Sequence, residues 1–182
     1  LSVTGSGAVW TVTASGVSGN GALGLKMTGV SGILKSGTQM AAPAPLPFPG
    51  EYYDVDQTRP TITSITRLGQ SPTNSNLLTW RVTLSEPLGA LSGLKAGNFL
   101  APPTTGGLSG VVQAPAPVGG NPYEWTVGYL LNGTTGDGTV QLNLNADYNL
   151  VQDVAGNSLP SNAIAGEVYA VDRTLPKIVS VA

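Results

Sequence analysis

The sequence predicts an all-β chain made of β-sandwich units, and three observations support this fold class. Apolar residues alternate with polar ones along several segments, turn-forming residues interrupt these segments, and motifs of the first third of the chain recur in the last third. Alternation with period two is typical of strands with one buried face, and closely spaced turns are typical of antiparallel sheets.

The alternation is clearest in the segments LLTWRVTL and TVQLNLN. Successive side chains of a strand point to opposite faces, so every second residue shares one face. The residues expected on the buried faces are Leu78, Trp80, Val82 and Leu84 in the first segment and Val140, Leu142 and Leu144 in the second. Near the N-terminus, the corresponding positions hold Leu23, Leu25 and Met27. We therefore expect all three segments to be half-buried strands.

Breaks rich in Gly, Pro, Asn and Asp separate these segments. They read LGQSPTNSN, APPTTGG, APAPVGGNP, NGTTGDG and VAGNSLPSN. About seven short strands divided by such turns are typical of a Greek-key sandwich, whose length of about 100 residues suits one domain.

A long internal repeat organises the chain. GEYYDVDQTRPTI, residues 50–62, recurs as GEVYAVDRTLPKI, residues 166–178, and Glu51 and Glu167 are 116 residues apart. Extended to sixteen residues, the two stretches share nine identical residues. The spacing predicts tandem repeats of about 116 residues.

The repeat predicts three parts, cut out of phase with the repeated unit. Residues 1–56 are expected to be the C-terminal half of one repeat, residues 57–172 a complete repeat, and residues 173–182 the first strand of the next.

Composition excludes several function classes. The net charge of −2 provides no field that would attract nucleic acid, and no apolar run approaches the length of about 20 residues that a membrane helix needs. Cysteine and histidine are absent, which excludes disulfides and thiolate metal sites. The usual general base and strongest nucleophile are also missing, so we expect a protein that is not an enzyme.

The ordered motifs resemble a known family. TWRVTLSEPLGAL is followed by NFL, WTV, GDGTVQLNL, VQDVAGNSL and GEVYAVDRTLPKI. This order is similar to that of the bacterial immunoglobulin-like repeats of very large surface and secreted proteins. There, a unit opens after D-x-T-x-P, carries T-F-S-E-P-V and D-F segments, and closes with D-x-A-G-N. The resemblance covers the whole chain, counting the half unit.

The resemblance implies an immunoglobulin-like Greek-key fold and an extracellular or cell-surface location. It also implies a structural or adhesive role as a stalk or filament spacer, without specifying a ligand. The partners expected are neighbouring repeats, other copies of the chain, and a glycan or protein of a cell surface.

The sequence departs from the family pattern at two places. Asn98 stands where the D-F aspartate is usual, and ILKSGTQM of the first half unit stands where the complete unit has VQDVAGNSL. Leu34 and Thr38 thus replace Asp153 and Asn157, so an ion site built on those two side chains should be absent from the first half unit.

The repeated VD-x-T-x-P segments are expected to be stiff linkers. Pro60 and Pro176 restrict their own backbone and that of the preceding residue. Asp56 and Asp172 can accept a hydrogen bond from the backbone two residues later, which is an Asx turn.

The same aspartates also raise the alternative of a calcium site. Asp56, Asp172, Glu86 and Asp153 would supply the hard oxygen ligands that Ca²⁺ prefers. Turn formation alone is the other interpretation, both for the linker aspartates and for Asp153, where Gly156 or Asn157 would take a positive φ. EF-hand spacing is absent, so the sequence leaves both open.

A carbohydrate- or ligand-binding sandwich is the alternative function. Aromatic loop residues would then contact sugar, with Tyr123 and Tyr148 as the candidates. Trp10, Trp80 and Trp125 lie in phase with apolar positions and are expected in the core.

The half repeat has one further consequence. Its unpaired strands would expose an apolar face and a sheet edge. Another copy could cover them with the terminal strand near residues 178–181, which would give a head-to-tail assembly by strand complementation.

Overall fold

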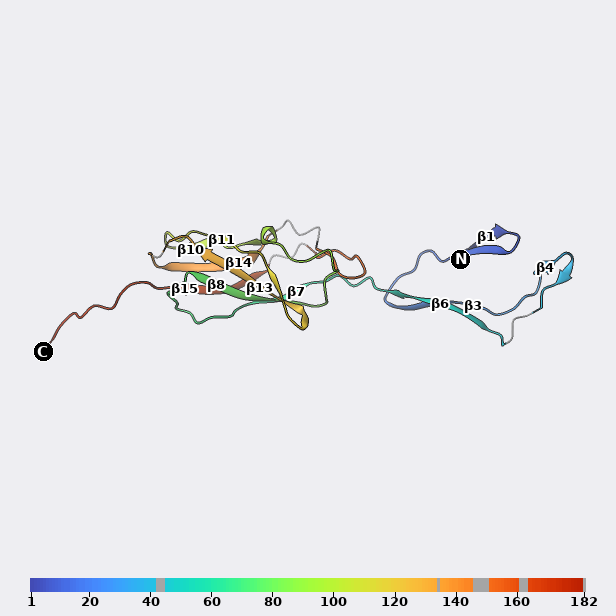
Figure 1. The fold of residues 1–182 in the computed structure, drawn as a ribbon, viewed down its shortest axis with the longest axis horizontal. Coiled ribbons are helices and arrows are strands. Elements are labelled where there is room, and N and C mark those ends of the chain that lie inside the picture. Colours follow the sequence, from blue (N-terminus) through green and yellow to red (C-terminus); the bar gives the residue numbers. More distant parts are fainter. Residues whose placement is uncertain (42–44, 134, 146–150, 161–163, 182) are drawn as a thin grey trace. The chain divides into compact units, whose positions relative to one another are not determined.

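The computed structural model describes residues 1–41, 45–133, 135–145, 151–160 and 164–181. Within these ranges the regular elements are β-strands and one 3₁₀ turn, so the prediction of an all-β chain is confirmed (Figure 1). The chain divides into two compact units, Leu1–Thr58 and Arg59–Ala182. The predicted repeat length of about 116 residues stays a prediction.

One sheet of the second unit has five antiparallel strands in the order β11-β13-β8-β7, with β12 also paired to β13. The strands are β7 (Ile62–Arg67), β8 (Leu77–Leu84), β11 (Gly110–Val112), β12 (Ala116–Val118) and β13 (Asn121–Leu131). The central pair is long and regular, because β13 aligns with almost all of β8.

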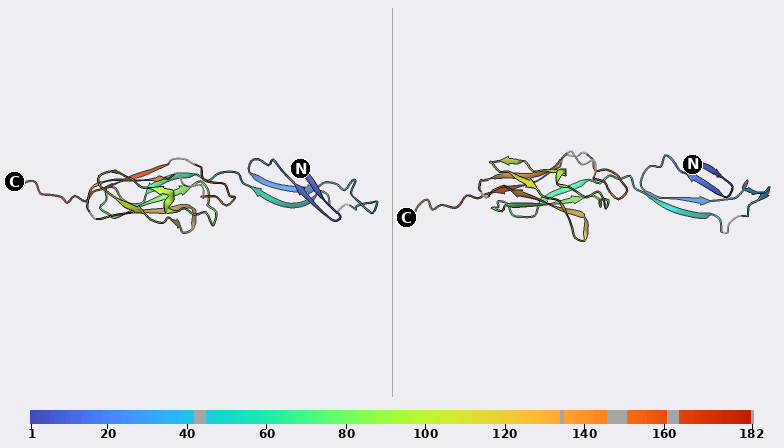
Figure 2. Two further views of the ribbon diagram at one scale, coloured as in Figure 1. Left: turned by 90° about the horizontal axis from the view of Figure 1, so that it is seen from above. Right: turned by 45° about the horizontal axis from the view of Figure 1, so that its top comes forward.

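The other sheet of this unit has four strands in the order β10-β14-β15, with β9 also paired to β14. The strands are β9 (Phe99–Leu100), β10 (Pro103–Thr105), β14 (Gly138–Leu144) and β15 (Ala165–Val171). The 3₁₀ turn Ala96–Asn98 leads into β9. Two antiparallel sheets around one core are consistent with the predicted β-sandwich (Figure 2).

The strand alternation predicted for the second unit is confirmed. Leu78, Trp80, Val82 and Leu84 of β8 are 1%, 0%, 0% and 3% exposed. Val140 and Leu142 of β14 are fully buried, and Leu144 is partly buried against the same core. Each large apolar side chain buried in this way contributes about 1.5–3 kcal/mol.

Trp80 and Tyr169 join the two sheets at the centre of the core. Their rings meet edge to face, with centroids 4.9 Å apart and planes at 85°. The Trp80 Nε1–H donates to the Glu167 carbonyl over 2.8 Å, so the indole is buried with its polar atom satisfied. The prediction that Trp80 is a core anchor is confirmed.

The described residues of the first unit form three separate strand pairs. They are β1 (Ser2–Ser6) with β2 (Val9–Thr13), β3 (Gly21–Met27) with β6 (Phe48–Val55), and β4 (Leu34–Lys35) with β5 (Thr38–Gln39). None of the residues whose burial is described in this unit is buried. The expected burial of Leu23, Leu25 and Met27 is wrong for this structure, since they are 37%, 47% and 37% exposed. The reason is that two-stranded pairs bury little side-chain surface without a second layer.

The β3–β6 and β14–β15 pairings have the same register. In the first unit the partners are Gly21 and Val55, Ala22 and Asp54, Leu23 and Tyr53, Gly24 and Tyr52. In the second unit they are Gly138 and Val171, Thr139 and Ala170, Val140 and Tyr169, Gln141 and Val168. Each pairing then shifts register once, after Gly24 in the first unit and after Gln141 in the second. Each of the five pairs of β14–β15 corresponds to a pair of β3–β6, which continues for one further pair, Met27 with Phe48.

Candidate functional site

Asp172 ends the second unit's sheet and forms a tight turn. It follows the last residue of β15, Val171, and its Oδ1 accepts from the Thr174 N–H over 3.0 Å. Its own N–H donates to the Thr73 carbonyl over 2.9 Å. The predicted Asx turn is therefore confirmed at this position, and its carboxylate serves a structural purpose.

Asp56 forms the same turn in the first unit. It follows Val55, the last residue of β6, and its Oδ1 accepts from the Thr58 N–H over 2.9 Å. The Asx turn predicted from the repeated VD-x-T motif is confirmed here too. Both linker aspartates have solvent-exposed side chains.

Asp153 lies in the turn that the VAGN motif predicts. Its side chain is buried, and its two oxygens accept from the Asn157 N–H over 2.8 Å and from the Asn157 Nδ2 over 2.9 Å. Gly156 has φ 93°, a backbone conformation that glycine adopts without a Cβ clash. The predicted turn is confirmed, because the Asp153 carboxylate bonds both polar groups of Asn157 and Gly156 takes the positive φ.

Glu86 lies near this turn. One of its carboxylate oxygens lies within 4.8 Å of one of Asp153. Two carboxylates at this separation suit a shared divalent cation, although Ca²⁺ takes six to eight oxygens in total. The two residues thus form the acidic pair in the second unit that could hold calcium. That Asp56, Glu86, Asp153 and Asp172 bind calcium stays a prediction.

Two residues that the sequence analysis missed contact the linker segments. Asn20 bonds Gln57 in the first unit, and Asp137 bonds Arg173 in the second. A signal for them exists in the sequence, because each directly precedes the glycine that begins a strand of the repeat, Gly21 or Gly138. The flanking residues differ, and Asn stands in one copy where Asp stands in the other. A comparison for identical residues therefore does not reveal the two positions.

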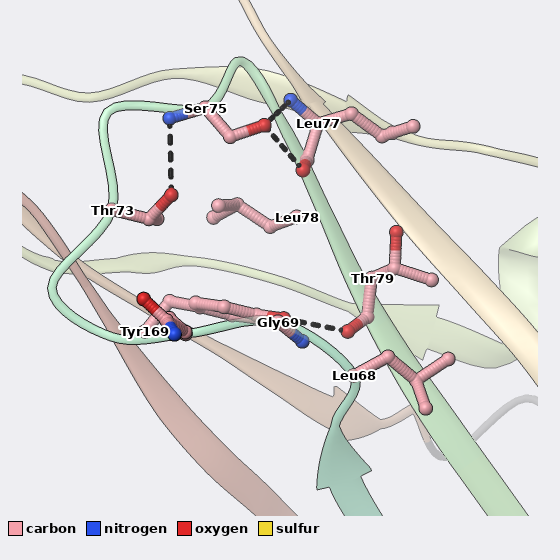
Figure 3. A pocket seen from close by; sticks show the side chains of 9 residues that line it. Leu68, Gly69, Thr73, Ser75, Leu77, Leu78, Thr79 and Tyr169 are labelled. Atoms are coloured by element: carbon pink, nitrogen blue, oxygen red, sulfur yellow. Dashed lines mark hydrogen bonds between the residues drawn. The ribbon is translucent and has the colours of Figure 1, made fainter.

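An open pocket of about 310 Å³ lies beside the loop that joins β7 to β8 (Figure 3). The Tyr169 hydroxyl accepts from the Gly69 N–H over 2.7 Å and donates to the Thr79 carbonyl over 2.9 Å. The Ser75 hydroxyl donates to the Leu77 carbonyl over 2.9 Å. These polar groups bond to one another, so the pocket offers few free polar groups that could orient a ligand.

Of the two aromatic candidates for sugar binding, the structure describes only Tyr123. Tyr123 is 43% exposed, and it lies on β13 rather than in a loop. Tyr148 lies outside the described residues. Trp125 is partly buried against the core. The expectation that Trp10 lies in a core is wrong for this structure, because the two-stranded β1–β2 pair leaves it 60% exposed. The carbohydrate-binding alternative stays a prediction.

The described part of the chain has no helix long and apolar enough to cross a membrane. We found no match to the chain among protein-family models, curated proteins or solved structures.

Proposed function

We propose that the chain is a non-enzymatic structural or adhesive repeat segment, located outside the cell, that acts as a stalk or filament spacer. Its partners would be neighbouring repeats, further copies of itself and a glycan or protein of a cell surface. The proposal builds on the sequence resemblance to bacterial immunoglobulin-like repeats and on the geometry of the two units.

The observation that carries the proposal is the matched register of β3–β6 and β14–β15. The register of a strand pair is set by the hydrophobic pattern of its strands, because a slip of one residue turns every side chain to the other face. Two segments of one chain that share five pairs and the same irregularity are best explained as copies of one structural unit. Serial copies of one unit suit a mechanical spacer better than a single active site.

The strand orders of the second unit favour the immunoglobulin-like Greek-key topology. If β7 is strand A, then β8, β13 and β11 correspond to B, E and D in the first sheet. In the second sheet, β10, β14 and β15 correspond to C, F and G. Orders ABED and CFG describe the constant-type immunoglobulin sandwich.

Single-molecule stretching of the full chain tests the spacer role. We expect a discrete unfolding event of the second unit, which releases about 370 Å when the residues between β7 and β15 become extended. The central β8–β13 ladder would resist the load until that event. Extension without any discrete event would contradict the proposal.

Strand complementation is a part of this proposal that concerns the apolar residues near the C-terminus. Ile178 and Val181 are each 86% exposed, whereas their repeat equivalents Ile62 and Ile65 are 5% and 4% exposed in the core. The first unit exposes the apolar face that such residues cover in the second unit. A second copy's residues 173–182 would lie on that face.

The mass of the chain in solution tests this assembly. We expect the mass to rise with concentration, and we expect Ile178→Ser with Val181→Ser to abolish the rise. A strictly monomeric chain at all concentrations would rule out complementation and leave the spacer role intact.

A further inference from the structure

In the second unit, Asp137 holds the linker segment with both of its carboxylate oxygens. Its Oδ1 accepts from the Arg173 N–H over 2.7 Å, and its Oδ2 accepts from the Thr174 hydroxyl over 2.5 Å. Asp137 lies directly before β14, whereas residues 173 and 174 follow β15. The contact therefore ties the start of one strand to the segment that leaves its neighbour.

In the first unit, Asn20 makes the corresponding contact. Its Oδ1 accepts from the Gln57 N–H over 2.7 Å, and its Nδ2 donates to the Thr58 hydroxyl oxygen. Asn20 lies directly before β3, and residues 57 and 58 follow β6. The same two linker atoms are bound in both units, the backbone N–H of the middle residue of D-x-T and the hydroxyl of its threonine.

The threonine explains how one motif accepts both partners. A hydroxyl can donate and accept, so Thr174 donates to a carboxylate while Thr58 accepts from an amide. The D-x-T motif therefore remains identical between the units, although the residue that binds it changes from Asn20 to Asp137.

The middle residue of the motif adds contacts that differ between the units. The Gln57 side chain accepts from the Gly19 N–H over 2.9 Å and donates to the Val17 carbonyl over 3.1 Å. The Arg173 guanidinium donates to the Asn76 Oδ1 over 2.5 Å and to the Thr135 carbonyl over 3.4 Å. The Gln57 side chain bonds residues of the first unit, and the Arg173 side chain bonds residues of the second. Each linker segment is therefore held on the unit whose last strand precedes it.

We propose that Asn20 and Asp137 are equivalent positioning residues that fix the exit segment of each unit, and that the clamp depends on ionisation in the second unit only. By clamp we mean the two bonds from Asn20 or Asp137 to its D-x-T segment. This inference rests on the proposed spacer function, which requires that the segment before each linker proline be held in one position on its unit. The residue before the strand, Asn20 or Asp137, thus has a role beside that of the repeated D-x-T motif.

The hydrogen bonds to Asp137 determine the sign of the pH dependence, and the Arg173 charge acts in the same direction. The Thr174 hydroxyl bond, with the Arg173 N–H bond and the Arg173 charge, holds the pKa of Asp137 below its ordinary value. Asp172, the other acidic group of this segment, directs its Oδ1 to the Thr174 N–H instead. The second clamp should hold above the ordinary aspartate pKa and loosen as pH falls through the lowered value. The Asn20 amide does not titrate.

The test measures amide hydrogen exchange by NMR in the full 182-residue chain. In Asp137→Ala, exchange at Arg173 should speed up about tenfold, because its N–H loses its acceptor. Gln57, bound by Asn20, is the internal control and should not change. Asp137→Asn imitates the first unit's residue and should restore the protection of the Arg173 amide. Its protection factor, the intrinsic exchange rate divided by the observed rate, should not change with pH.

The reciprocal variant keeps the inference falsifiable if Asp137→Ala disturbs folding. Asn20→Asp should give the Gln57 amide a protection factor that falls in acid and should leave the protection factor of Arg173 unchanged. An unchanged protection factor at Arg173 in Asp137→Ala would overturn the inference. So would a loss of Arg173 protection in Asp137→Asn, if the Gln57 protection factor in Asn20→Asp is also independent of pH. The unfolding event under force reports the spacer role independently, since it depends on the strand ladders rather than on the exit segment.

Discussion

The two units place the same pattern of residues in different environments. Leu25 and Leu142 hold corresponding positions of the alternating pattern on strand pairs of the same register, yet they are 47% and 0% exposed. In the second unit, a sheet containing β7, β8 and β13 lies over Leu142 and its neighbours. Alternation therefore identifies the apolar face of a strand, whereas the burial of that face requires a second layer.

The largest difference between the units should appear on truncating this leucine. Leu142→Ala should lower the free energy of unfolding by about 2–5 kcal/mol, because it removes buried methyl groups and leaves a cavity. Leu25→Ala should change it by about 0.5 kcal/mol or less, as at a surface position. Urea denaturation followed by circular dichroism measures both. Equal losses in the two variants would mean that Leu25 is covered in solution, which would sharpen the case for a partner on that face.

Calcium should stabilise the chain through the acidic residues of the second unit. Calcium at about one hundred times its dissociation constant would add about 2.7 kcal/mol, seen as a rise of several degrees in the melting temperature that chelator reverses. Glu86→Gln should remove most of the rise. Glu51→Gln removes the same charge elsewhere and should retain it. No shift in the unmodified chain would leave Asp56, Asp153 and Asp172 as turn formers alone.

A smaller loss of stability is expected on removing the Tyr169 hydroxyl, which bonds both ends of the loop between β7 and β8. Tyr169→Phe should cost about 1–3 kcal/mol, because the Gly69 N–H and the Thr79 carbonyl lose their shared partner. The repeat equivalent Tyr53 is 74% exposed, so Tyr53→Phe should change stability by about 0.5 kcal/mol or less. Urea denaturation of both variants tests this, and identical stabilities of the two would contradict the role given to the Tyr169 hydroxyl.

The smallest effect concerns the glutamates at the start of the repeated motif. Glu167 Oε2 accepts from the Arg67 N–H over 2.8 Å and lies 3.5 Å from the Arg67 Nε. Both side chains are partly exposed, so Glu167→Gln should cost no more than about 1 kcal/mol. Glu51→Gln in the first unit should have no measurable effect. A loss above about 2 kcal/mol for Glu167→Gln would show that the pair is better shielded than its exposure indicates.

Several parts of the fold and the site follow from local sequence rules. The strand positions of β8 and β14, the Asx turns at Asp56 and Asp172, and the glycine turn after Asp153 all depend on residues close in the chain. Such features are determined by backbone sterics and by short-range hydrogen bonds, which the order of residues specifies directly.

Other parts depend on contacts between residues far apart in the chain. The Asn20 and Asp137 contacts join residues 37 and 36 positions apart, and no local rule predicts that a residue before one strand will bind the segment after another. The proximity of Glu86 to Asp153 is of the same kind.

The sequence by itself determined the all-β class, the alternating faces and the turns, because each depends on a few neighbouring residues. Only the tertiary structure decided which apolar faces are buried, since Leu25 and Leu142 satisfy the same pattern and differ in what lies over them. It also decided which polar residues hold the linkers. The physical reason is that burial and long-range hydrogen bonds are properties of packed layers, whereas pattern and propensity are properties of the chain alone.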